Sequence, residues 1–236
     1  ICSTGYYYEG QGAPHYFNFR QALGFPVEEE IYEMMVREIT VGIGNTSVRA
    51  GVIKLGSSKH AITEYERLFF RAGARAQQET GVPIITHTTE GTMGVEQAEL
   101  LIALGADPKK IQIGHMDGST DPQYHQATMD QGVRIAFDSC GIQHMLGMPM
   151  DATRVDVLTG LLRSGCGSQI MLSHDYVMHW LGRPLPVPPP IRQLLPNWHL
   201  SGIFTYHLPA LRANGISEAQ VEALLVENPR RLFVGE

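Results

Sequence analysis

The chain has 236 residues, 43% of them hydrophobic, and a formal net charge of −6. This length suits one large core, and we expect a single domain over residues 1–236. An acidic chain without a Lys/Arg cluster does not attract phosphate backbones or anionic lipid, so nucleic acid and membranes are not expected partners. Three cysteines without a CxxC pair, and no apolar span or leader, favour a reducing, cytoplasmic location.

Strand and helix patterns alternate along the chain. The segment 1–8 is rich in β-formers, and the next element is a helix introduced by Pro26 with acids in its first turn. Thr63 and Glu66 form a capping-box pattern that opens a helix ending near Thr80, before Gly81 and Pro83. The predicted strands are residues 1–8, 48–54, 83–87, 111–115, 133–138 and 169–173, and further helices are predicted over 94–104, from Asp121, and over 152–163.

This alternation, with short and almost continuously apolar strands, predicts an α/β fold with a parallel sheet covered by helices. A doubly wound nucleotide-binding sheet should carry a glycine-rich phosphate turn, and neither GxGxxG nor GxxxxGKS/T occurs. Polar residues at the ends of successive strands favour a TIM-type (β/α)8 barrel instead. Six strands leave such a barrel about two strands short, and we expect the missing pair before Ile1.

A proline-rich segment at 176–200 interrupts the alternation. Prolines at this density predict an extended excursion over the barrel mouth without regular helix. In the tail, Ser217 and Gln220 form a second capping box, and NPRRLF near the end is predicted to be the helix that closes the barrel.

Four residues with ligand or base chemistry lie at or just after predicted strand ends: Lys54, His87, His115 and Asp175. In a parallel barrel these positions converge at one mouth. Each histidine alone is more often structural, and Asp175 alone could cap a helix. Lys54 follows an apolar strand, where an unpaired ammonium is costly, so it needs a partner or a chemical role. Together, imidazole and carboxylate suit zinc, manganese or a similar divalent ion.

At these residues the chain resembles the phosphotriesterase family of the amidohydrolase superfamily, and its phosphotriesterase-like lactonases in particular. The motifs that carry the resemblance span most of the chain: STGYYY, GVIK, GVPIITHT, IQIGHMD, IMLSHDY, NWH and ENPRRLF. The resemblance implies that Lys54 is carboxylated and bridges two metals, that His87 and His115 bind the more exposed metal, and that Asp175 binds the buried metal and acts as a base. It also implies a metal-activated hydroxide as the nucleophile.

Two departures from the family pattern qualify this assignment. The His-x-His that supplies two ligands to the buried metal has no counterpart in the 236 residues, so we expect weak occupancy of that site or a first segment supplied by further sequence. Asp138 is followed by Ser139, where some family members have a histidine relay. The expected cofactors are divalent ions, zinc first, with cobalt, manganese or iron as alternatives.

Tyr7 and Trp198 resemble the aromatic positions with which the lactonase branch holds its substrate, although core packing explains such residues equally well. Met145, Leu146 and Met148 are candidates for an apolar wall. His174 precedes Asp175, so strand alternation predicts that it faces away from the site.

The resemblance implies a metal-dependent hydrolase acting on a lactone, a carboxyl ester or a phosphotriester. The rival interpretation is a non-catalytic protein that binds a small ligand on a degenerate barrel. The expected partner is a small-molecule ester or lactone, and a homodimer is left open.

Overall fold

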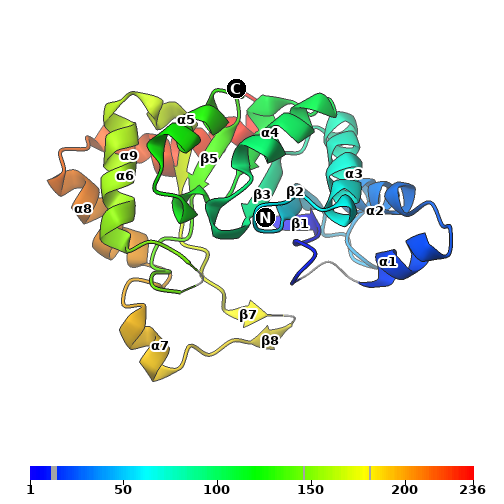
Figure 1. Cartoon of the computed structure of the whole chain (residues 1–236), viewed down its shortest axis with the longest axis horizontal. Coiled ribbons are helices and arrows are strands. Elements are labelled where there is room, and N and C mark those ends of the chain that lie inside the picture. The colour runs from blue at the N-terminus through cyan, green and yellow to red at the C-terminus, as the bar shows by residue number, and fades with distance from the viewer. Residues whose placement is uncertain (12–14, 146, 181) are drawn as a thin grey trace.

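Six parallel strands form the centre of the fold, with helices packed around them (Figure 1). The computed structural model describes residues 1–11, 15–145, 147–180 and 182–236. The strands are β1 (Cys2–Gly5), β2 (Ala50–Ser57), β3 (Ile84–Thr88), β4 (Ile111–Ile113), β5 (Arg134–Phe137) and β6 (Ile170–Leu172). They lie side by side in sequence order and every neighbouring pair is parallel. The predicted α/β class is confirmed, and this strand order is that of a (β/α) barrel.

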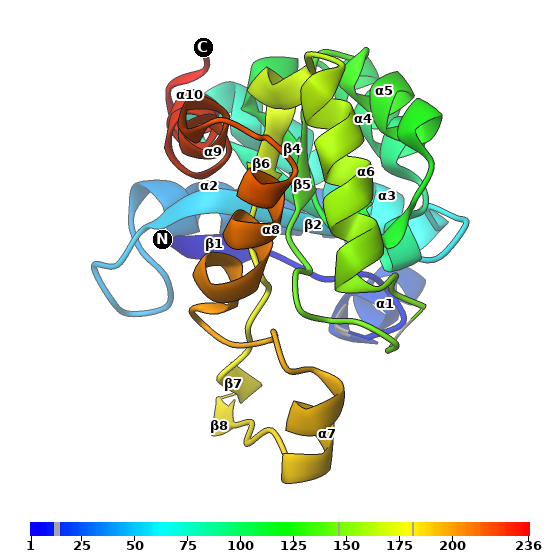
Figure 2. The same ribbon diagram turned by 90° about the vertical axis from the view of Figure 1, so that its left-hand side faces the viewer.

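Helices connect the consecutive strands of the six-stranded sheet, and further helices follow β6 (Figure 2). Both predicted capping boxes are present, at Thr63 with Glu66 and at Ser217 with Gln220. The α-helices are α1 (His15–Ala22), α2 (Val27–Thr40), α3 (Glu64–Thr80), α4 (Gly94–Ala103), α5 (Pro122–Met129), α6 (Asp151–Arg163), α7 (Pro189–Leu194), α8 (Leu208–Ala213), α9 (Glu218–Glu222) and α10 (Asn228–Val234). Among the described residues, no helix has the length and apolar character needed to cross a membrane.

Side-chain alternation along β2 separates the core from the candidate site. Ile53 and Leu55 are fully buried and lie against Gly73 of α3, on the helix-covered side. Lys54, between them, therefore projects to the opposite, inner side of the sheet. There it lines an inner cavity with Val52 and residues of the other strands. The strand thus contributes to the core and to the candidate site through alternate residues.

Two predicted strand ends differ from the structure by three residues, and the other four by one or two. The opening strand ends at Gly5 and not at Tyr8, because Gly5 has φ +104° and turns the chain close to Lys54. Lys54 lies within β2 rather than at its end, because the strand continues to Ser57 and pairs with β3 up to Thr88.

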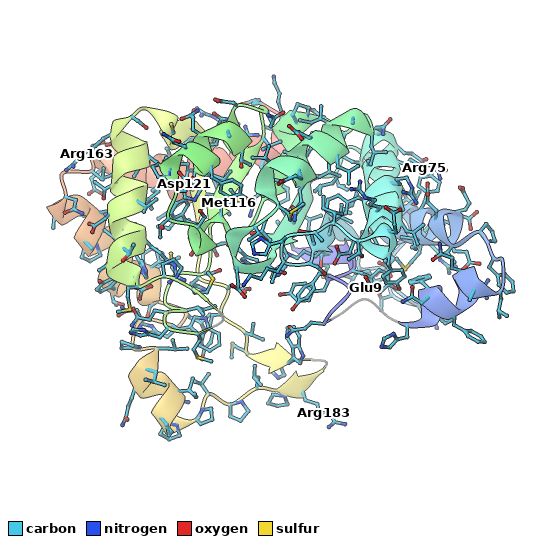
Figure 3. The ribbon with its side chains drawn as sticks, viewed as in Figure 1. Glu9, Arg75, Met116, Asp121, Arg163 and Arg183 are labelled. Carbon is cyan, nitrogen blue, oxygen red and sulfur yellow. The ribbon has the colours of Figure 1, made fainter. Side chains whose placement is uncertain are left out.

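The proline-rich segment forms an arm that projects from the body in both views (Figures 1 and 2). It contains a short antiparallel pair, β7 (His179–Trp180) and β8 (Arg183–Pro184), followed by α7. In Figure 3, Arg183 extends from the far side of this arm, whereas Met116 lies within the body. The expectation that this segment lacks regular helix was wrong, because its prolines fall at the N-terminal end of α7, where a missing N–H leaves no hydrogen bond unmade.

Candidate functional site

A cavity of about 190 Å³ opens beyond the carboxyl ends of the central strands. Three of the four predicted metal ligands, His87, His115 and Asp175, line it. Lys54 lines the adjoining inner cavity of about 440 Å³, and His115 and Asp175 border both spaces. The structure therefore brings the four residues to one place although 121 positions separate the first from the last in sequence (54 to 175). This is the convergence predicted for strand ends in a parallel barrel.

The Lys54 amine lies in a desolvated position on the inner side of β2. Burial lowers its pKa, while the nearby carboxylates of Asp138 and Asp175 act in the opposite direction. Its Nζ atom donates a hydrogen bond to the carbonyl of Thr86, at 3.1 Å. Burial therefore favours the neutral amine, which is the form that can react with carbon dioxide to give a carbamate.

The His87 ring at the end of β3 is held neutral. Burial, together with the nearby His115 and Lys54, lowers the pKa of His87 to about 2. Its Nε2 atom lies 3.1 Å from Thr89 Oγ1, whereas Nδ1 is buried and has no hydrogen-bond partner among the described residues. A neutral imidazole with an unpaired buried nitrogen is the form in which histidine binds a metal.

His115 is fixed by Asp138. The Oδ1 atom of Asp138 lies 2.8 Å from His115 Nδ1 and accepts the His115 backbone N–H at 2.7 Å. Burial lowers the pKa of His115, but the charge and hydrogen bond of Asp138 outweigh it, and the pKa is raised. The two rings of His87 and His115 meet nearly edge to face, with centroids 4.6 Å apart. His87 and His115 therefore border the same cavity with their rings in contact.

Asp175 lies three residues beyond β6 with a left-handed backbone, φ +43°. Desolvation raises the pKa of its carboxyl group, against the lowering effects of His115 and Lys54. Its carbonyl oxygen and that of His174 both face the Trp198 indole, with Nε1 at 3.3 Å and 3.2 Å respectively. His174 itself does not line the cavity within the described part of the chain, in line with its predicted orientation.

Aromatic rings surround the His87 side of the cavity. Tyr7 lies 4.4 Å from His87 between ring centroids, and Tyr8 is stacked on the same imidazole at 5.2 Å and 7°. Trp180, on the arm, meets Tyr7 edge to face at 6.5 Å. Desolvation raises the pKa of Tyr7, so its hydroxyl stays protonated. Tyr7 lines the cavity, and its role as a substrate contact stays a prediction.

Trp198, which the sequence predicts as a substrate contact, lies away from the His87 cavity. Among the described residues it does not line the His87 cavity but a separate space with Tyr176 and Leu195. Of the three residues predicted to form an apolar wall, Met148 lines the His87 cavity, Met145 does not, and Leu146 lies outside the described residues.

The donor set fits a metal only if Lys54 contributes to it. Within the ranges that the structure describes, no group of three His, Cys, Asp or Glu side chains could hold an ion by itself. The unpaired Nδ1 of His87 and the deprotonation-prone Lys54 provide the missing elements, because a carbamate on Lys54 would add carboxylate oxygens beside the imidazoles. The residues present therefore fit a carbamate-assisted metal site.

Sequence reasoning missed three residues as site components. Asp138 was noted only as the residue before the position of the relay histidine, which is Ser139 here, although its contact with the backbone and ring of His115 follows from its position just after β5. Tyr8 was passed over because three consecutive tyrosines give no signal for which ring faces the site. Trp180 was not identified because it lies in the arm, and no periodic sequence pattern predicts the path of that segment.

The sequence matches the model of the phosphotriesterase family over residues 1–233. The aryldialkylphosphatase of Saccharolobus solfataricus is 34% identical over 87% of this chain and 64% of its own length. The phospho-furanose lactonase of Mycoplasmopsis synoviae is 31% identical over 99% of this chain and 66% of its own length. The structure of the organophosphorus hydrolase from Deinococcus radiodurans is 57% identical with a TM-score of 0.94, over 99% of this chain and 70% of that one. The chain thus spans slightly under two thirds of the length of each of these two curated relatives.

Proposed function

Because the chain belongs to the phosphotriesterase family, we propose that it is a metal-dependent hydrolase that cleaves a lactone, a carboxyl ester or a phosphotriester. The convergence of Lys54, His87, His115 and Asp175 on adjoining cavities carries this proposal. The names of the relatives support hydrolysis of both ester classes: an aryldialkylphosphatase, an organophosphorus hydrolase and a lactonase.

The proposed ligands are a carboxylated Lys54 with His87 and His115 for one ion, and Asp175 with Lys54 for a second. Zinc is the first choice, with cobalt, manganese and iron as alternatives. Such ions, when bound, would acidify a water and polarise the carbonyl or phosphoryl oxygen of the substrate. Within the chain, Asp138 fixes the tautomer and orientation of His115 through its hydrogen bond to Nδ1.

Asp175 is the proposed acid–base group. Its carboxyl borders the cavity and has a raised pKa, so it can accept a proton from the attacking water and pass it to the leaving group. Tyr7, which contacts both His87 and Trp180, provides an aromatic surface beside His87 for the non-reacting part of the substrate. We favour lactones over phosphotriesters because the chain resembles the lactonase branch in its aromatic residues and arm.

The test begins with hydrolysis by the protein reconstituted with zinc, cobalt or manganese. We expect activity that depends on metal and disappears with a chelator, with acyl-lactones cleaved faster than aryl phosphotriesters. Lys54→Ala should abolish this activity while the circular dichroism spectrum is retained. Unchanged turnover in this variant would refute the bridging role of Lys54.

The proposed carbamate on Lys54 can be detected directly by NMR. ¹³C NMR of protein equilibrated with ¹³C-bicarbonate and metal should show a carbamate signal that is missing in Lys54→Ala. The rival function, binding of a small ligand without turnover, predicts ligand binding that is unaffected by the chelator and no metal-dependent hydrolysis.

The three cysteines carry free thiols, which supports a cytoplasmic location as part of the proposal.

A further inference from the structure

Trp198 and its neighbour Asn197 connect two parts of the structure. Trp198 contacts the backbone at Asp175, and Asn197 contacts the buried side chain of Asp151. Its indole N–H faces two successive carbonyl oxygens, those of His174 and Asp175, at 3.2 Å and 3.3 Å. These carbonyls bracket a non-glycine residue in the left-handed region, φ +43° at Asp175. Such a conformation persists only when the surrounding structure holds it. The indole N–H is a contact that does so.

The residue before Trp198 is anchored in turn. Asn197 donates from Nδ2 to Asp151 Oδ2 at 2.9 Å, and Asp151 is 1% exposed. The other carboxyl oxygen of Asp151 accepts from Gly141 N and from Arg154 Nη1, each at 2.9 Å. Asp151 therefore holds a fixed position at the start of α6, and Asn197 transfers that position to the arm.

Close packing reinforces this anchor. Gly141 has φ +92°, and a Cβ atom at this position would lie 2.6 Å from Trp198 Cα and 2.7 Å from Asn197 O. Only glycine lets the β5–α6 connection approach the backbone of residues 197–198 so closely. The indole is thus attached to a rigid, buried support and not to the exposed part of the arm.

We propose that Trp198 is a positioning residue that sets the Asp175 carboxyl through the backbone of residues 174–175, and that Asn197 and Asp151 hold Trp198 in place. This inference rests on the proposed function for the role of Asp175. It separates the two tryptophans of the arm: Trp180 contacts Tyr7, which lines the cavity, and the Trp198 indole contacts the backbone of Asp175.

Trp198→Phe tests the proposal because it keeps an aromatic ring and removes the N–H. With the metal-reconstituted chain we expect kcat to fall by about tenfold to a hundredfold with KM unchanged, since small misplacements of a reacting group cost rates of this order. Asn197→Ala, which removes the anchor one step away, should lower kcat in the same direction. A raised KM with unchanged kcat in Trp198→Phe would make Trp198 a substrate contact and overturn the proposal.

Amide hydrogen exchange gives a readout that does not depend on activity. Exchange at residues 174–176 should become faster in Trp198→Phe and in Asn197→Ala, and it should stay unchanged in Trp180→Phe, the matched aromatic control. Equal exchange in wild type and both anchor variants would overturn the proposal even if kcat falls. Failure of the wild type to hydrolyse any ester with metal would instead refute the proposed function, while the exchange comparison would still decide whether Trp198 holds this loop.

Discussion

Arg154 and Asp117 form an ion pair with no access to solvent: Arg154 Nε lies 3.0 Å from Asp117 Oδ2, and the side chains are 2% and 0% exposed. The same guanidinium pairs with Asp151 at 2.9 Å. Burial raises the pKa of Asp117 to about 6, although Arg154 acts to lower it. One cation thus compensates two buried carboxylates, one beside the His115 loop and one under the arm.

Replacing Arg154 with Met should strongly destabilise the protein. Removal of one partner from a buried pair leaves an uncompensated charge and costs about 3–5 kcal/mol. Urea unfolding measures the loss in the free energy of unfolding. Arg230→Met is the matched control, because Arg230 is 48% exposed and pairs with Glu227 and Glu236 at the surface, where solvent screening makes the expected loss much smaller. Similar losses in the two variants would contradict a special role for the buried pair.

Gly141→Ala should reduce both stability and activity. The added Cβ would meet the backbone of residues 197–198 at a positive φ, and such strain costs about 1–3 kcal/mol. Gly160→Ala is the control within α6, since nothing lies within 4 Å of its Cβ position, and this change should stabilise the helix by about 0.5–1 kcal/mol. Opposite shifts in melting temperature are therefore expected. A Gly141→Ala variant as stable and active as wild type would show that the close approach is not required.

Trp180→Ala should weaken substrate binding more than turnover. Trp180 lies against Tyr7, which lines the cavity, and an aromatic pair contributes about 0.5–1.5 kcal/mol beyond its buried area. We expect KM to rise by up to about tenfold, the factor that corresponds to 1.4 kcal/mol, with a smaller change in kcat. Steady-state kinetics with an acyl-lactone measures both values. Leu185→Ala, an exposed change on the same arm, is the control and should leave KM unchanged.

His125 should make the metal-free protein less stable as the pH falls below about 6.5. Burial lowers its pKa, its Nε2 lies 2.8 Å from the Met116 carbonyl, and its buried Nδ1 has no partner among the described residues. Below the unfolded pKa of 6.5 the unfolded chain binds the proton and the folded chain does not, so stability present above this pH is lost on acidification.

The comparison of wild type with His125→Gln at two pH values isolates this effect. Between pH 7.5 and 5.5 the wild type should lose more stability than the variant, by up to about 1.4 kcal/mol per pH unit below 6.5. The pH-independent cost of the substitution cancels in this difference. Parallel loss in both proteins would mean that His125 is protonated in the fold.

Local sequence patterns predicted most of the framework. Capping residues such as Thr63 and Ser217 define helix starts through contacts with residues three positions away. Short apolar runs indicate the strands. Helix starts and strands can therefore be predicted without knowledge of tertiary contacts. The metal-site candidates were found because strand ends converge in any parallel barrel. The location of Lys54 within β2 was not predicted, because pairing with β3 extends the strand beyond its apolar run.

Tertiary contacts account for what sequence reasoning missed. The role of Asp138 depends on reaching His115 across neighbouring strands, and the choice among consecutive tyrosines depends on the turn at Gly5. The path of the arm places Trp180 against Tyr7, which lines the cavity, and places the Trp198 indole against the carbonyl of Asp175, although both are aromatic residues in one irregular segment. No local pattern distinguishes these two positions.

The left-handed backbone at His115 and Asp175, φ +56° and +43°, has a consequence for directed evolution. Glycine adopts this conformation with less steric cost than His or Asp, so a library screened for heat resistance alone would favour glycine at the two positions. Each such replacement would raise the melting temperature but remove a candidate metal ligand, His115 or Asp175. A thermostabilisation programme for this chain should therefore keep both codons fixed and select on turnover as well as on heat resistance.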